Sequence, residues 1–213
     1  MAQQSDVIGR ARALQELVRA EAPRTESQRT LTAPVVQALL DAELFYLMVP
    51  AALGGLEVDG RTYLEVVEAI AAADGSTGWC VMIGAEVNGM VGVNLPADVA
   101  RGMLFQHGPI CCAGSAIPEG AVSIERTGDQ YRVSGRWRFA SGCQHAAYLF
   151  AFAPLCAAGQ PVLQDNAPTM PFTSAPIMTH HPVEPSAAAR ASTTSRYVRP
   201  STSSPPKAAG TIR

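Results

Sequence analysis

The first half of the chain carries apolar residues at the spacing of a helix. Between residues 7 and 20 they recur every three or four positions with charged side chains between them, which predicts a helix that Pro23 ends. A second apolar stripe occupies residues 35–45. Because Thr32 is placed to cap this stripe, we expect a second helix that continues until Pro50 stops it.

Three further helices follow from the same kind of pattern. Residues 62–73 place apolar side chains, Leu64 among them, on one face and glutamates toward water. Residues 74–76 break this helix and cap the next one. Residues 77–93 carry almost no charge, as expected of a helix that other helices surround, and residues 96–105 form a short amphipathic segment.

The pattern changes from helical to alternating at Ile110. Predicted strands occupy residues 110–115, 121–126, 130–139 and 146–153. Helices followed by strands predict an α+β fold, with an N-terminal all-α helical domain (1–108) and then an antiparallel β domain (109–165). Residues 166–213 are dominated by Pro, Ser, Thr and Ala, and such a composition predicts a disordered tail because it buries too little surface to order itself.

Composition narrows the function classes. The chain has 213 residues, 47% of them hydrophobic, and a net charge of -2, so neither nucleic acid nor an acidic membrane surface is a predicted partner. The longest apolar stretch, residues 81–93, contains Glu86 and Asn88 and falls short of a membrane span. Residues 1–12 lack the apolar core of a secretory signal, which favours a cytoplasmic protein. The five cysteines form no Cys-x-x-Cys pair and are interpreted as reduced thiols without a metal.

Residues 128–142, GDQYRVSGRWRFASG, contain the most informative pattern. Gly128-Asp129 predicts a turn, apolar and arginine residues then alternate, and Ser134-Gly135 predicts a bulge or a second tight turn. The strand that follows places the aromatic ring of Phe139, the hydroxyl of Ser141 and a glycine within a short length of backbone. This combination suits a flat ligand with a polar edge.

Residues 111–142 as a whole, CCAGSAIPEGAVSIERTGDQYRVSGRWRFASG, resemble the middle of the acyl-CoA dehydrogenase superfamily. The segments FYLMVPAALGG (45–55) and DGSTGW (74–79) are similar to the helical part of that superfamily, and the resemblance covers roughly residues 7–154. It implies a helical domain, a β domain and then a C-terminal helical bundle, for which this sequence shows no matching segment. The Ser-Gly-Cys-Gln-His run at residues 141–145 resembles the flavin-dependent aromatic hydroxylases of the superfamily.

The resemblance implies a site for FAD or FMN, bound as reduced flavin. By resemblance Phe139 lies against the isoalloxazine and Ser141 near N5, while the backbone around Gly114, Ser115 and Ala116 meets the pyrimidine edge. Trp79 and His145 would border the substrate. Each of these residues also has a structural interpretation, as core, turn or strand residues, and the sequence assigns no catalytic residue.

The functional alternatives are of three kinds. The first is the oxygenase component of a two-component flavin monooxygenase, which receives reduced flavin from a flavin reductase and hydroxylates an aromatic or related small molecule. The second is an acyl-CoA dehydrogenase acting on an acyl thioester, and the third is a truncated, non-functional remnant.

The resemblance to the superfamily also implies a homotetramer. Arg132, Arg136 and Arg138 either contact a phosphate group or form a solvated outer face.

The tail has a second interpretation. Residues 188–203 can be back-translated with GC-rich codons so that a shifted reading frame encodes Thr-Gly-Lys-His-Asp-Phe-Thr-Val, which resembles the superfamily at that point. On this hypothesis residues 166–213 are a frameshift product, and the underlying DNA read in all frames distinguishes it from a genuine tail.

Overall fold

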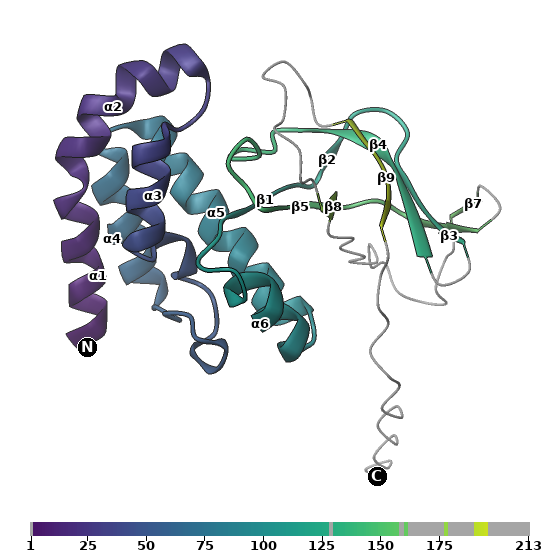
Figure 1. Ribbon diagram of the computed structural model, residues 1–213, viewed down its shortest axis with the longest axis horizontal. Coiled ribbons are helices and arrows are strands. Elements are labelled where there is room, and N and C mark those ends of the chain that lie inside the picture. The colour runs from purple at the N-terminus through teal and green to yellow at the C-terminus, as the bar shows by residue number, and fades with distance from the viewer. Residues whose placement is uncertain (1, 128–129, 158–159, 162–176, 179–189, 196–213) are drawn as a thin grey trace, which may run out of the picture.

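The computed structural model describes residues 2–127, 130–157, 160–161, 177–178 and 190–195. Helices form one half of the molecule and strands the other (Figure 1). The helices are α1 (Ala2–Ala13), α2 (Gln15–Gln28), α3 (Ala33–Asp41), η1 (Leu44–Tyr46), η2 (Ala51–Leu53), α4 (Gly60–Ala71), α5 (Gly75–Asn94) and α6 (Ala97–Phe105). The predicted α+β class is confirmed. None of the helices in the described ranges combines the length and the apolar character that a bilayer crossing needs.

The prediction of one helix ended by Pro23 is wrong. The helix breaks earlier, at Leu14, and α2 then continues through Pro23 to Gln28. Proline removes one i to i−4 hydrogen bond, and the carbonyl that loses its partner belongs to Arg19. Because Arg19 is exposed, water can donate to that carbonyl instead. An exposed helix surface therefore accommodates a proline that a buried helix would not.

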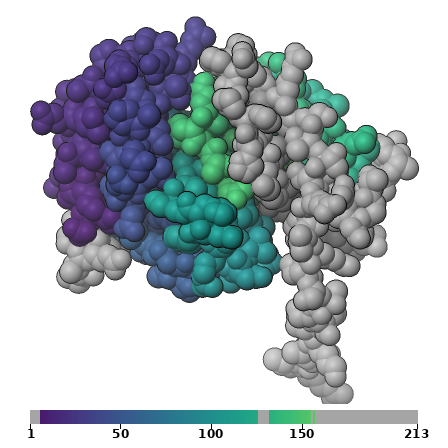
Figure 2. All heavy atoms as spheres, in the orientation of Figure 1, coloured from purple at the N-terminus to yellow at the C-terminus, as the bar shows by residue number. Residues whose placement is uncertain are grey.

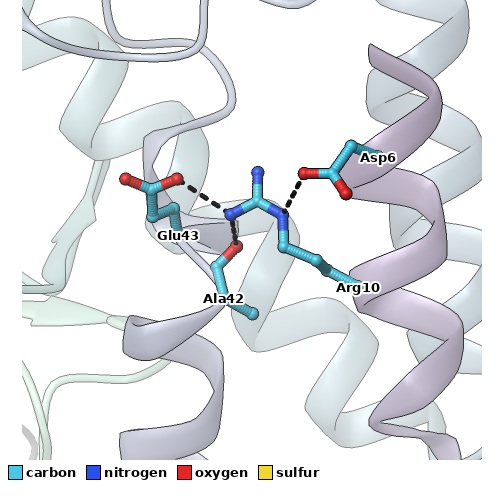
Figure 3. Close-up of polar contacts among 4 residues, drawn as sticks. All are labelled: Asp6, Arg10, Ala42 and Glu43. Atoms are coloured by element: carbon cyan, nitrogen blue, oxygen red, sulfur yellow. Dashed lines mark hydrogen bonds and ion pairs between the residues drawn. The ribbon is translucent and has the colours of Figure 1, made fainter. Parts of the chain in front are cut away.

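The second predicted helix also ends elsewhere, at Asp41 instead of Pro50. Figure 3 shows the cause: Arg10 of α1 donates to the carbonyl of Ala42 at 2.8 Å and to the carboxylate of Glu43 at 2.8 Å, and its Nε lies 3.4 Å from Asp6. Glu43 adopts a left-handed backbone, with φ 59°. A tertiary contact from α1 thus satisfies a carbonyl at the end of α3 and turns the chain into η1.

Local capping chemistry fixes the starts of α4 and α5. Asp59 accepts from the N–H of Thr62 at 2.9 Å, and Asp74 accepts from the N–H of Thr77 at 2.7 Å. The predicted burial of Leu64 is wrong, since its side chain is 62% exposed. The buried face of α4 is centred on Val66, and Leu64 lies about 200° around the helix from it at two residues' distance.

The strands form two sheets. They are β1 (Cys112–Ser115), β2 (Ile117–Pro118), β3 (Ser123–Thr127), β4 (Gln130–Arg138), β5 (Tyr148–Ala151), β6 (Leu155–Ala157), β7 (Gln160–Pro161), β8 (Ile177–Met178) and β9 (Arg190–Ser195). The first sheet has the order β1-β5-β8, and the second has the order β2-β4-β3-β6-β7 with β9 beside β4. Strands β3 and β4 form the predicted antiparallel hairpin. Strand β4 runs through Ser134-Gly135 without a second turn.

Most strand pairs of the β domain are antiparallel, as predicted, and two pairs are parallel. β1 pairs with β5 in parallel, and β3 pairs with β6 in parallel. Parallel neighbours need a long connection, and the hairpin between β1 and β5 supplies one. Strands β8 and β9 lie in the segment predicted to be a tail, and the remainder of that segment, with the shifted-frame hypothesis that concerns it, lies outside the described residues.

The described residues form a main hydrophobic core in each half and a small third cluster, Ala113 and Leu149, against which Cys143 and Ala146 pack. The larger core contains the helices and also Cys111, Cys112 and Phe150, so it extends into β1 and β5 beyond residue 108. In Figure 2 the helices form one continuous mass against which the green segment near residue 150 packs. The smaller core lies within the second sheet, around Val133 and Trp137. Because β1 and β5 are anchored in the helical core, the loop that joins β4 to β5 is held beside the helices.

Candidate functional site

A cavity of about 640 Å³ lies where the end of α2, the start of α5 and the loop between β4 and β5 meet. Its volume is within the usual range of sites for small molecules. The wall contains Thr25, Glu26, Arg29, Thr30, Leu31, Gly75, Ser76, Trp79, Cys80, Ala140, Ser141, Gly142, Cys143, Gln144 and His145.

The loop of residues 139–147 is shaped by its own backbone hydrogen bonds. The N–H of Cys143 donates to Ala140 at 3.0 Å, and the N–H of His145 donates to Gly142 at 3.2 Å. Gly142 has φ 82°, and a Cβ at this position would meet Nε2 of His145 at 3.1 Å, so a glycine is required here. The N–H of Ala147 then donates to Cys111 at 2.8 Å, which returns the chain to β1.

Trp79 and Ser141 meet at the cavity. The indole Nε1 of Trp79 donates to the hydroxyl oxygen of Ser141 at 3.0 Å. This hydrogen bond joins α5 to the loop after β4, and Trp79 stays 53% exposed. Because the Ser141 oxygen acts as acceptor, its own O–H remains able to donate to a ligand.

His145 and Cys143 are the titratable groups that the loop contributes to the cavity wall. Burial lowers the pKa of the His145 imidazole from 6.5 to about 4. Both ring nitrogens are buried without a hydrogen-bond partner in the described part of the chain, and the ring lies 6.4 Å from that of Phe45. The imidazole is therefore neutral at neutral pH.

The other residues expected to contact the flavin differ in their exposure and in their hydrogen bonds. Phe139 is 75% exposed, has a left-handed backbone with φ 60°, and is not part of the cavity wall. The hydroxyl of Ser115 is buried, donates to the carbonyl of Arg138 and accepts from the N–H of Ile117 at 3.1 Å. Gly114 packs against Phe150, and Ala116 is exposed.

The structure thus brings Trp79, Ser141 and His145 together in one cavity wall, and it leaves Phe139 and residues 114–116 outside that wall. A bulky residue with positive φ is a rare conformation, which is a reason to consider a functional constraint at Phe139. The assignment of these residues to a flavin stays a prediction.

Acidic side chains lie beside the three arginines of β4. Arg138 lies 2.6 Å from the carboxylate of Glu119, and Arg136 lies 3.9 Å from it. The hydrogen bond from Arg138 lowers the pKa of Glu119. Arg132 stands opposite Glu125 in the β3–β4 register. These acidic neighbours favour the interpretation of an outer charged face over a phosphate site.

The thiols beside the cavity are unreactive by environment. All five cysteines are free, and burial raises the pKa of Cys80 to about 11 and that of Cys112 to about 12. A thiol with such a pKa is protonated near neutral pH and is a poor nucleophile. Among the residues that the structure describes, no group of three or more His, Cys, Asp or Glu side chains is arranged to hold a metal ion.

Thr25, Glu26 and Arg29 are cavity residues that sequence reasoning missed. They lie at the end of α2, more than a hundred residues from the loop that faces them, and no motif marks them. The sequence predicted that α5 starts near Gly75 and Ser76, because residues 74–76 were expected to cap it. The sequence did not predict that this helix end lies near His145.

Comparison with known proteins places this architecture in a family. Residues 5–95 match the family described as acyl-CoA dehydrogenase, N-terminal domain. The solved structure of XiaF from Streptomyces sp., in complex with FADH2 and glycerol, superposes with a TM-score of 0.67 at 25% identity, over 75% of this chain and 40% of that one. Residues 5–95 belong to the acyl-CoA dehydrogenase N-terminal domain family.

Two curated relatives of this chain are oxygenase components, as the sequence predicted. The flavin-dependent monooxygenase oxygenase subunit HsaA of Mycobacterium tuberculosis (strain CDC 1551 / Oshkosh) is 33% identical over 68% of this chain and 36% of the relative. The FADH(2)-dependent resorcinol hydroxylase oxygenase component of Rhizobium sp. (strain MTP-10005) is 30% identical over 73% of this chain and 38% of the relative. The chain therefore spans less than half the length of these relatives.

Proposed function

We propose that this chain carries part of the active site of the oxygenase component of a two-component flavin monooxygenase. In this proposal a flavin reductase supplies reduced flavin, FAD or FMN, and the substrate is a small aromatic molecule. The observation that supports it best is the Trp79–Ser141 hydrogen bond in the wall of a cavity that also contains His145. The named functions of the relatives point in the same direction.

The residues fit a flavin in two respects. The ring of Phe139 is uncovered and can lie against a flat heterocycle, and the Ser141 hydroxyl has a free proton to donate to a flavin nitrogen. Ser115 would contribute through its backbone, because its hydroxyl is already committed to Arg138 and Ile117. Reduced flavin, when bound, supplies the electrons with which dioxygen is activated for transfer of one oxygen atom to the substrate.

The contribution of this chain is to bind and orient the substrate and to limit water. Trp79 offers an apolar face to an aromatic ring and stays fixed by its bond to Ser141. His145 adds an uncharged ring to the wall, since burial keeps its pKa near 4. Leu31, Cys80 and Ala140 add apolar surface to this part of the wall, and exclusion of water protects reactive oxygen chemistry from side reactions.

The alternative of an acyl-CoA dehydrogenase requires a carboxylate base near the substrate. The described wall of the cavity contains one carboxylate, that of Glu26, which is exposed and lies at the α2 end, away from the Trp79–Ser141 bond in sequence and element. That carboxylate does not distinguish the two activities, and the oxygenase proposal is preferred because the two curated relatives are named oxygenase components.

Anaerobic titration of the purified chain with reduced FAD and with reduced FMN tests the proposal. We expect one flavin to bind, and Ser141→Ala to weaken binding roughly fivefold because one neutral hydrogen bond contributes about 1 kcal/mol. Ser27→Ala is the control, since the Ser27 hydroxyl bonds only to Arg24 on the exposed side of α2. Absence of binding to either flavin would contradict the proposal and support the remnant alternative.

A further inference from the structure

We propose that the loop of residues 139–147 is an acid-sensitive gate of the cavity, closed while the His145 ring is neutral and open once the ring binds a proton. Residues 140–145 of this loop form one side of the cavity wall, so the position of the loop decides how accessible the cavity is. The inference goes beyond the oxygenase proposal and does not depend on it, because loop opening is measured without flavin or substrate.

The closed loop offers a protonated His145 no partner. Both ring nitrogens are buried, and neither has a hydrogen-bond partner among the described residues. The ring lies 6.4 Å from that of Phe45, which is fully buried, and a Cβ on Gly142 would lie 3.1 Å from Nε2. A neutral imidazole already loses its hydrogen bonds with water in this position, and a charged one would lose a much larger hydration free energy.

No neighbouring charge compensates for that loss. The titratable and charged side chains on the elements around the ring are Glu26 and Arg29 of α2, Cys80 of α5, Cys143 of the loop, and Tyr46 and Cys111 on the core side. Burial raises the pKa of all three thiols and of the Tyr46 hydroxyl, so these groups are neutral in acid. Burial alone accounts for the lowered pKa of His145, without a contribution from Glu26 or Arg29. A protonated ring is therefore stable only where it reaches water.

An outward movement of the loop brings the His145 ring to water. Phe45 belongs to the helical core, so the inner side of the ring is closed. The N–H groups of Cys143 and His145 bond to carbonyls within the loop, at 3.0 and 3.2 Å, so this part of the loop moves as a unit. The Trp79–Ser141 hydrogen bond is exposed, and water replaces both of its partners when the loop opens.

The base of the loop stays attached while its outer part moves. The N–H of Ala147 donates to the carbonyl of Cys111 at 2.8 Å, which fixes the loop where β5 begins. Cys143 and Ala146 pack against the apolar cluster of β1 and β5, and this packing favours the closed position while the ring is neutral. The two positions of the loop therefore differ in a few contacts and in the hydration of one imidazole.

The direction of the pH effect follows from the two environments of the ring. In the closed loop the pKa of His145 is about 4, and in the open loop, where the ring meets water, the pKa returns to 6.5. The closed form is therefore fully favoured above pH 6.5, and this preference is lost as the pH falls toward 4. Between pH 7 and pH 5 the ratio of open to closed loop should rise roughly twentyfold.

Amide hydrogen exchange of the purified chain, resolved by peptide mass spectrometry, measures the opening. The N–H groups of Cys143, His145 and Ala147 are hydrogen-bonded in the closed loop and report on it. After correction for the intrinsic exchange rate at each pH, we expect residues 139–147 to exchange roughly twenty times faster at pH 5 than at pH 7. The loop should also exchange faster than the buried amides of α5 and stay insensitive to low urea, because a local opening exposes little surface.

Variants separate the His145 ring from other effects of acid. His145→Leu and His145→Gln replace the ring by an apolar and a polar side chain that do not titrate, so their corrected loop exchange should be equal at pH 7 and pH 5. His107→Gln is the control and should keep the twentyfold change, because His107 is exposed outside the loop. Ser141→Ala removes the bond to Trp79 and should speed loop exchange by the same factor at both pH values.

Three results would overturn the inference. The first is loop exchange in the unaltered chain that does not accelerate between pH 7 and pH 5. The second is an equal acceleration in His145→Leu and His145→Gln, which would assign the effect to other groups. The third is equal protection and equal urea dependence of the loop and α5, which would show that the loop opens only when the whole chain unfolds.

Discussion

At the scale of single residues, His145 makes the stability of the protein depend on pH. Its pKa is about 4 in the folded protein, against 6.5 for an ordinary histidine, because the imidazole is buried. Between these values the unfolded chain binds a proton that the folded chain does not. Stability is therefore complete above pH 6.5 and falls as the pH drops toward 4, by about 3 kcal/mol in total from this group.

Replacing this histidine should remove that part of the pH dependence. We expect urea unfolding of the unaltered chain to show a larger loss of unfolding free energy between pH 7 and pH 5 than unfolding of His145→Gln. His107→Gln is the control, because His107 is exposed. Equal losses in all three proteins would show that His145 is not protonated differently in the folded and unfolded states.

At the scale of elements, the predictable features are those with local causes. The starts of α4 and α5 follow from aspartate caps that are visible in the sequence. The end of α3 depends on Arg10, which lies more than thirty residues away, so no local pattern predicts it. Leu64 was misplaced for a related reason, since the neighbouring helices decide which side of α4 is buried.

Replacing Gly78 and Gly102 by alanine should change the free energy of unfolding in opposite directions, because α4 and α5 approach closely at Gly78. A Cβ on Gly78 would lie 2.7 Å from Cα of Ala71, so Gly78→Ala must separate the two helices. On Gly102 of α6 the nearest atom is the side-chain oxygen of Gln106 at 3.7 Å. We expect Gly102→Ala to stabilise by about 0.5–1 kcal/mol and Gly78→Ala to destabilise by about 1–3 kcal/mol.

Thermal unfolding followed by circular dichroism measures both changes. Gly102→Ala serves as the control for helix propensity, because it gains the same preference for helix without the contact. If Gly78→Ala also raised the melting temperature, the two helices would lie further apart than the structure places them.

At the scale of the whole molecule, the order of helices and strands predicted the fold class, and non-local contacts determined the rest. Nothing in the sequence predicts that β1 and β5 pair in parallel. The sequence of the hairpin between them is compatible with either direction of β5. The cavity likewise arises where the end of α2 meets the loop after β4. Trp79, Ser141 and His145 could be predicted because motifs mark them, and Arg29 could not.

Asn88 joins the helical core to the strands. Its side chain is fully buried, donates to the carbonyl of Ile110 at 3.0 Å and accepts from the N–H of Cys112 at 2.9 Å. Asn88→Ala would leave two buried backbone groups unpaired, so we expect a loss of about 2–4 kcal/mol in unfolding free energy. Asn94→Ala is the control, because Asn94 bonds only within α5 at an exposed position and should change stability by less than about 0.5 kcal/mol.

The same variant tests whether the two cores unfold together. In a Trp79→Phe background the fluorescence comes from Trp137, which is 3% exposed in the strand core, while circular dichroism at 222 nm follows the helices. The two signals should coincide in urea for the parent and separate in Asn88→Ala, because the hydrogen bonds that couple β1 to α5 are gone. Coincident curves in the variant would mean that the remaining contacts, among them the Ile110–Tyr46 hydrogen bond and the packing of Cys111, Cys112 and Phe150, couple the cores.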